Sequence, residues 1–122
     1  MKKYNAFLIL FVGCSLSLAN CTFKNFNERQ LVGQWFSSEW LRDGVETEMK
    51  VWFEFSEDKT YRAVIDRNQE EGKWWIDGEK LYTQVEGEER VVVRIERLDD
   101  GNLELGMNRG GQRELLVFVR GQ

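Results

Sequence analysis

Residues 51–65 read Val51-Trp52-Phe53-Glu54-Phe55-Ser56-Glu57-Asp58-Lys59-Thr60-Tyr61-Arg62-Ala63-Val64-Ile65. On either side of the polar triplet Glu57-Asp58-Lys59, every second side chain is apolar, which is the period of an extended strand with one buried face. The stretch therefore predicts two antiparallel strands joined by a short turn. The side chains expected inside are those of Val51, Phe53, Phe55, Tyr61, Ala63 and Ile65.

The same pattern continues along the chain, with a turn signal about every ten residues. The signals are Arg42-Asp43-Gly44, Glu57-Asp58-Lys59, Arg67-Asn68-Gln69, Asp77-Gly78, Glu86-Gly87, Asp99-Asp100-Gly101-Asn102 and Asn108-Arg109-Gly110-Gly111. Short, regular spacing of this kind indicates an all-β fold in which each strand pairs with the next. Closing the sheet removes its two edges, so we expect an eight-stranded antiparallel up-and-down β-barrel over residues 33–122. Before the barrel, Asn27 is expected to cap a short helical turn.

The first twenty residues form a segment of a different kind. A basic start, Met1-Lys2-Lys3, precedes an apolar run over residues 6–12 that is too short to span a bilayer. Small and polar residues then lead to Cys21. This order is typical of a secretory signal peptide, which we assign to residues 1–20. The alternative is that the run is a buried strand of the domain.

The exit of this segment resembles a bacterial lipoprotein signal, in which the first residue of the mature chain is a diacylated cysteine. Leu18-Ala19-Asn20-Cys21 matches at its first two positions, whereas Asn20 departs from the small residue that the motif prefers. The resemblance implies lipidation of Cys21 and export to the periplasmic or cell-surface side of a bacterial membrane. Residues 21–32 then comprise the lipidated Cys, a tether and the helical turn expected at Asn27. Lipidation at Cys14 and cleavage to a soluble secreted protein are the alternatives.

Composition excludes several functions. Removing residues 1–20 takes away two lysines and no acid, so the formal net charge goes from −4 to −6, and nucleic-acid binding by charge is not expected. The chain has no His and only 2 Cys, too few thiolates for a structural zinc site. No motif for nucleophilic or phosphoryl chemistry is present. We therefore expect a protein that is not an enzyme, with no catalytic residues, metal or cofactor.

Two further motifs resemble a known family. Gly33-Gln34-Trp35 opens the first predicted strand and Arg120 ends the last. Together with residues 53–61 and with Gly72-Lys73-Trp74-Trp75-Ile76, they resemble the lipocalin superfamily, and in particular the small bacterial lipocalin-like lipoproteins. The likeness covers residues 31–120. It implies that Trp35 sits at the closed end of the barrel with Arg120 across its ring, a cation–π contact worth about 0.5–2 kcal/mol.

The remaining aromatic side chains suggest where a ligand would bind. Large inward residues predict a mostly filled barrel with a shallow apolar pocket at one end. The candidate ligand-binding residues near the open mouth are Trp40, Phe53, Phe55, Tyr61 and Trp74. Trp52 and one residue of the pair Trp74-Trp75 are expected on the outer wall, where residues 23–31 would cover them or leave an exposed patch.

Two functions follow from these expectations. The first is a membrane-anchored, extracytoplasmic lipocalin-like protein that binds a small apolar ligand or lipid without chemical change. The second is a filled β-barrel that acts as a cell-surface protein-interaction or inhibitor module through its outer tryptophans. The sequence identifies no protein partner.

Overall fold

The computed structural model describes residues 25–121, so the predicted signal peptide, Cys14 and Cys21 lie outside the described residues. One helical turn, α2 (Glu28–Leu31), precedes the sheet. The strands are β1 (Gly33–Arg42), β2 (Val45–Glu46), β3 (Val51–Phe55), β4 (Thr60–Ile65), β5 (Asn68–Asp77), β6 (Lys80–Gln84), β7 (Val91–Leu98), β8 (Asn102–Arg109) and β9 (Gln112–Arg120). Within residues 25–121, no helix is both long and apolar enough to cross a membrane.

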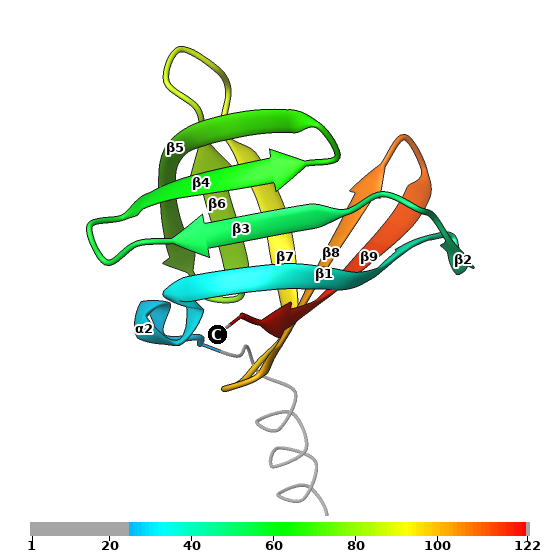
Figure 1. Cartoon of the computed structure of the whole chain (residues 1–122), viewed down its shortest axis with the longest axis horizontal. Helices are drawn as coiled ribbons and strands as arrows, with labels where there is room; N and C mark the ends of the chain where they lie inside the picture. Colours follow the sequence, from blue (N-terminus) through cyan, green and yellow to red (C-terminus); the bar gives the residue numbers. More distant parts are fainter. Residues whose placement is uncertain (1–24, 122) are drawn as a thin grey trace, which may run out of the picture.

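The strands form one antiparallel sheet that closes on itself (Figure 1). Neighbours follow chain order from β3 to β9, and β1 pairs with both β3 and β9. The two-residue strand β2 pairs only with the end of β1, so the barrel itself has eight strands. The predicted eight-stranded antiparallel barrel is confirmed.

One end of the barrel is closed by α2. Asn27 caps the turn, as expected, and does so in a capping box: its side chain accepts from the helix backbone, while the Gln30 side chain accepts from the Asn27 backbone N–H. Leu31 is fully buried, and its carbonyl accepts a hydrogen bond from Trp35 Nε1 at 2.9 Å. Glu28 accepts from the Ile76 backbone N–H. These contacts hold α2 across what we call the closed end, where the β3–β4, β5–β6 and β7–β8 turns also lie (Figure 1).

This position corrects one expectation about residues 23–31. The described part of that segment does not cover the tryptophans of the outer wall, because it lies across the closed end. The Phe26 backbone N–H donates to the Gly78 carbonyl of the β5–β6 turn, and Lys59 Nζ of the β3–β4 turn lies 2.6 Å from Glu28 Oε1. The apolar side chains of the segment instead extend the core at this end, where Phe26 packs against the buried cluster.

Two turns show how backbone conformation depends on residue type. In the β3–β4 turn, Lys59 adopts a positive φ of 71°. Left-handed backbone favours glycine, so a lysine here carries a steric cost. In the β5–β6 hairpin, Asp77 pairs with Lys80, which leaves Gly78 and Glu79 as the two loop residues. Of these two, Gly78 alone has a positive φ, and the loop begins one residue after the start of the Asp77-Gly78 turn signal.

The core fills the closed half of the barrel. Phe53, Phe55, Tyr61, Trp74 and Phe118 form one aromatic cluster, with neighbouring ring centroids 5.1–6.2 Å apart. Such edge and offset contacts add about 0.5–1.5 kcal/mol per pair beyond the apolar area that is buried. The predicted inward set on β3 and β4 faces this core, with Val51, Phe55, Tyr61 and Ala63 buried.

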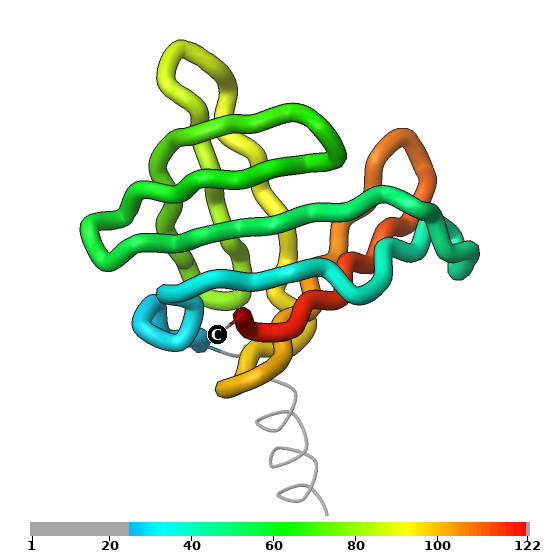
Figure 2. The backbone as a smooth tube through the Cα atoms, in the orientation of Figure 1, coloured from blue at the N-terminus to red at the C-terminus, as the bar shows by residue number. Residues whose placement is uncertain are grey.

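The wall of the barrel divides toward the other end, which we call the open end. Strands β1 and β3 pair only as far as Phe36 with Trp52, and β7 and β8 only as far as Arg94 with Gly106. Beyond these pairs, strands β3–β7 form one wall and strands β8, β9, β1 and β2 form another, which bends away from it (Figures 1 and 2). A β-bulge lies near each division, between Ser37 and Glu39 and between Ile95 and Arg97. Bulges bend and twist a strand, which accounts for the separation of the walls.

Candidate functional site

Gly33, Trp35 and Arg120 meet at the closed end. The Arg120 Cζ atom lies 4.2 Å from the centroid of the Trp35 ring, and the two residues are register partners across β1 and β9. The guanidinium also donates to three backbone carbonyls: Nη1 to Val32 at 2.8 Å, Nη2 to Gln30 at 2.7 Å and Nε to Asp100 at 2.6 Å. The cation–π contact expected from the sequence is therefore present, and Arg120 additionally binds the α2 terminus and the β7–β8 turn.

Gly33 makes room for this arginine. A Cβ atom built on Gly33 would lie 2.6 Å from Arg120 Nη1, closer than non-bonded atoms approach, and the residue has a φ of 129°. Both the space and the backbone conformation therefore require glycine at this position.

Four of the five candidate ligand-binding residues lie in the aromatic core, and two of these are far from the mouth. Phe55 and Trp74 are 1% exposed, and Trp74 Nε1 donates to the carbonyl of Ser56 in the closed-end turn at 3.1 Å. The expectation that both lie near the open mouth is wrong, because the aromatic cluster fills the closed half. Phe53 occupies the middle of this cluster, between Phe55 and Phe118.

Tyr61 extends from the core toward the open half. Its hydroxyl donates to Glu70 Oε2 at 2.7 Å. Glu70 faces the interior, since it pairs with the buried Ala63 across β4 and β5. Burial raises the pKa of Tyr61 well above its ordinary range, and the hydrogen bond to Glu70 is the next largest cause. The phenol is therefore a fixed neutral donor inside the barrel.

Trp40 lies inside the open end, as expected, in a polar cluster that the sequence analysis missed. Its Nε1 donates to Glu114 Oε1 at 3.1 Å. Glu114 is only 4% exposed and also binds Arg42 Nε and Arg109 Nη2, each at 3.1 Å. Burial alone raises the pKa of the Glu114 carboxyl, but the hydrogen bonds from Arg109 and Trp40 and the charges of both arginines outweigh it and hold the pKa below its usual value.

The signal for Glu114 was present in the alternation of the last strand. Glu114, Leu116 and Phe118 are two residues apart, and all three are buried. A carboxylate in the inward phase of a strand needs compensating donors, which Arg42, Arg109 and Trp40 supply. Glu114 was not predicted to face inward, because the inward set was assigned from apolar residues alone.

Two clefts open where the walls divide. The larger, about 810 Å³, lies between β7 and β8. It is lined by Leu41, Gly44, Lys80, Val92, Val93, Arg94, Glu96, Gly106, Met107, Asn108, Arg113, Glu114 and Leu115. The smaller, about 490 Å³, lies between β1 and residues 46–50 and includes the carboxylates of Glu39, Glu46 and Glu48. The larger cleft falls within the 300–1,000 Å³ range of small-molecule sites.

The larger cleft passes through the wall. Val93, Met107 and Glu114 belong to the inward phase of their strands, whereas Val92 and Arg94 flank Val93 and point outward. A molecule in this cleft would therefore contact the outer face of the sheet and the side chains of the open half together.

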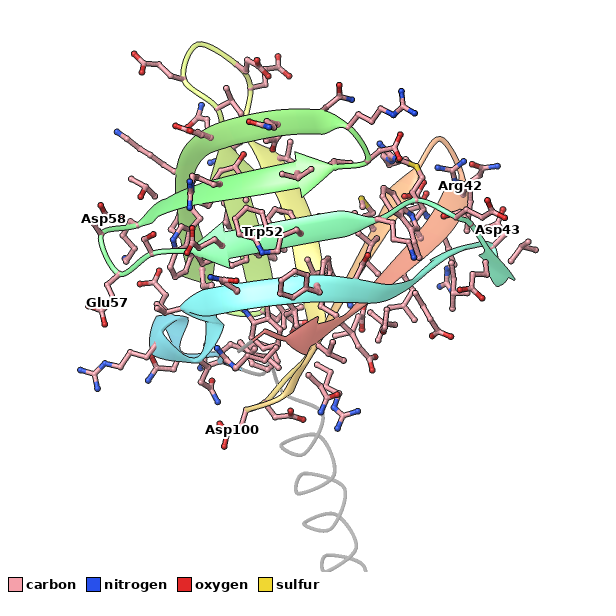
Figure 3. All side chains as sticks on the ribbon, viewed as in Figure 1. Arg42, Asp43, Trp52, Glu57, Asp58 and Asp100 are labelled. Carbon is pink, nitrogen blue, oxygen red and sulfur yellow. The ribbon has the colours of Figure 1, made fainter. Side chains whose placement is uncertain are left out.

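The outer wall carries the predicted second set of aromatic residues. Trp75 stacks on Tyr82 with ring centroids 5.2 Å apart, and Trp74 faces inward, as expected for adjacent residues of a strand. Trp52 stands on the outer face of β3 (Figure 3) and contacts Phe36, with ring centroids 6.5 Å apart. Phe36 and its register partner Val119 are each 44% exposed. Together with Val64, the partner of Trp52, they form an apolar row that we call the outer patch.

Among the residues that the structure describes, no three His, Cys, Asp or Glu side chains are placed to hold a metal ion.

Comparison with known proteins places this geometry in a family. A family model described as a lipocalin-like domain matches residues 31–105. The chain therefore belongs to the lipocalin-like domain family, whose barrel supports a binding function.

A solved structure has the same fold. The crystal structure of a lipocalin-like protein from Bacteroides uniformis covers 75% of this chain and 99% of its own, with a TM-score of 0.59 and 15% sequence identity. At this identity the similarity concerns the fold alone. No curated protein matches the chain.

Proposed function

We propose that this protein binds a small, largely apolar ligand at the open end of its barrel, without changing the ligand chemically. Two structural differences between the ends support this. The closed end is filled by the aromatic core and covered by α2, whereas the walls separate at the open end. The observation on which the proposal rests is the 810 Å³ cleft between β7 and β8, with Val92, Val93, Met107, Leu41 and Leu115 in its lining.

Exposed apolar side chains support the same location. Val91 and Val92 on β7 are 54% and 42% exposed. Val91 is in the inward phase of β7, but β8 does not pair with this part of the strand, so the side chain is left uncovered at the mouth. Uncovered apolar groups beside a cleft favour an apolar occupant.

A second part of the proposal concerns location. We propose export and attachment to a bacterial membrane through acyl chains on Cys21, which the lipoprotein-like signal supports. Each buried CH₂ of such a chain contributes about 0.8 kcal/mol to membrane binding. Labelled palmitate should enter the wild-type chain and fail to enter Cys21→Ser. Full labelling of Cys21→Ser would move the anchor to Cys14.

Ligand binding can be tested on residues 22–122, which contain the complete barrel, α2 and every core residue described above. A native mass spectrum of this domain, purified from the source cells without delipidation, should show a discrete small-molecule adduct. Val92→Trp should remove the adduct by filling the cleft. Val119→Trp is the matched control, because Val119 is similarly exposed but lies outside the cleft.

One observation favours a second function, that of a protein-interaction module. The outer patch of Phe36, Trp52, Val64 and Val119 lies on the side of the barrel and is independent of the cleft. A bare mass in the native spectrum, with tryptophan fluorescence unchanged on adding fatty acids, would contradict ligand binding and favour this alternative.

A further inference from the structure

The 810 Å³ cleft has a charge that opposes the charge of the whole chain. Lys80, Arg94 and Arg113 line it, against the carboxylates of Glu96 and Glu114. Glu114 is already bound by Arg42 and Arg109, so Glu96 is the carboxylate of the lining that remains to offset the three cations. The chain carries a formal net charge of −4, so this gathering of cations does not follow from composition. We call this site the cationic cleft.

The cations of the cleft are weakly paired. Arg94 Nη1 lies 3.8 Å from Glu79 Oε1, at the long limit of an ion pair. Among residues 25–121, neither Lys80 nor Arg113 has a carboxylate within 4.0 Å of its charged group. Their charge is therefore available to an anion.

Register places the charged and apolar parts of the cleft in one row. Lys80, Arg94, Gly106, Leu115 and Leu41 are successive partners across β6, β7, β8, β9 and β1. Their neighbours Leu81, Ile95, Leu105 and Leu116 are buried, so this row faces outward. Two cations stand at one end of the row and two leucines at the other.

Gly106 forms the middle of the row and leaves it without a side chain. A Cβ atom there would lie 2.7 Å from Glu96 Oε2, so the Glu96 side chain extends over this position. The row is thus cationic at Lys80 and Arg94, covered by the Glu96 side chain at Gly106 and apolar at Leu115 and Leu41, and it continues inward at Val93 and Met107.

We propose that the cationic cleft binds a single-chain amphiphile with an anionic head group, such as a carboxylate. The head group is held by Lys80 and Arg94, and the chain runs past Gly106 and Glu96 to Leu115 and Met107. The proposal rests on the proposed binding function and specifies its ligand class. The other cleft, with Glu39, Glu46 and Glu48, has the opposite charge and does not suit such a head group.

The test compares three ten-carbon probes by isothermal titration calorimetry on residues 22–122: decanoate, 1-decanol and decyltrimethylammonium. Decanoate should bind at least about tenfold more tightly than the other two, which corresponds to about 1.4 kcal/mol. Higher salt should weaken decanoate binding and leave decanol unaffected. Acetate, which has the head group without the chain, should not bind.

Matched variants assign the effect to the cleft. Lys80→Gln combined with Arg94→Gln should weaken decanoate binding about tenfold and leave decanol binding unchanged. Arg62→Gln is the control, because Arg62 is an exposed arginine that is paired with Glu54 on the outer wall, away from the cleft. Thermal melts verify that each variant is folded.

The outcomes separate this inference from the proposed function. Equal binding of all three probes, or tightest binding of decyltrimethylammonium, would overturn the anionic head group while ligand binding stands. Binding of acetate as tight as that of decanoate would replace the amphiphile with a simple anion. If no probe binds and the native mass spectrum is bare, the proposed function itself fails.

Discussion

Arg120 lies across the ring of Trp35, with its guanidinium carbon 4.2 Å from the ring centroid. The two residues belong to the last and first strands of the barrel, so their contact lies on the ladder that closes it. The same guanidinium donates to the carbonyls of Gln30, Val32 and Asp100. One side chain therefore joins α2, β1, β9 and the turn before β8.

Replacing Arg120 should therefore lower the free energy of unfolding. Arg120→Ala removes a cation–π contact and three charge-assisted hydrogen bonds, so the free energy of unfolding should fall by about 2–3 kcal/mol. Urea denaturation followed by tryptophan fluorescence measures the change. Arg62→Ala, which removes an exposed ion pair with Glu54, should change the free energy much less, because solvent screens exposed ion pairs. Equal effects of the two substitutions would mean that the closing contact contributes little.

Gly33→Ala should act through the same arginine. The added Cβ would displace Arg120 Nη1 and strain the backbone, so we expect a loss of about 1–3 kcal/mol. In a double-mutant cycle, the double variant should lose less unfolding free energy than the two single variants lose together. The reason is that Arg120→Ala removes the group with which the added Cβ of Gly33→Ala collides. Gly44→Ala is a control for backbone strain, since Gly44 has a φ of 83° and open space around it. Full additivity would show that Gly33 does not act through Arg120.

Glu114 should make stability depend on pH in the acid range. Its folded pKa lies below the ordinary value of 4.5, so the stabilisation is complete above the unfolded pKa and is lost as the pH falls through the folded pKa. Glu114→Gln should lower the free energy of unfolding by about 1–2 kcal/mol at pH 7 and flatten its dependence below about pH 4.5. Urea midpoints across pH 2–7 measure both effects. A variant that keeps the full acid dependence would exclude Glu114 as its source.

The β7–β8 turn contains a carboxyl group whose titration can be observed directly. Hydrogen bonds from the Asn102 side chain and the Gly101 backbone lower the pKa of Asp99 from 3.8 to about 2, with Arg97 adding to the effect. Carboxyl-carbon NMR should therefore place the midpoint of Asp99 near pH 2. Asn102→Ala should raise it toward 3.8, whereas Asn108→Ala in the next hairpin should leave it unchanged. A midpoint near 3.8 in the wild type would mean that these hydrogen bonds do not persist in solution.

The sequence was sufficient to predict the barrel, because a period of two and regular turns are local signals. The inward set on β3 and β4 and the opposite directions of Trp74 and Trp75 followed from alternation alone. Alternation failed at the bulges. Ile95 and Leu98 are both buried although they are three residues apart, because the bulge between Ile95 and Arg97 shifts the phase.

The arrangement of the open end could not be predicted in the same way. The length over which β1 pairs with β3, or β7 with β8, depends on twist and bending of the whole sheet rather than on any local motif. The inward direction of Glu114 follows from its alternation with Leu116 and Phe118, but its partners Arg42 and Arg109 come from other strands and needed the structure. The location of residues 25–31 also needed the structure, because their apolar content does not indicate which surface they cover.

The division of the wall separates folding from recognition within one small domain. The contacts of Leu31, Trp35, Phe118 and Arg120 lie at the closed end, whereas the cationic cleft begins at Arg94 and Gly106, the last shared pair of β7 and β8. Substitutions at Val92, Asn108 or Arg113 therefore leave the closing ladder intact. A library randomised at such rim positions should yield soluble variants of altered ligand preference, so this scaffold is suited to engineering new binders.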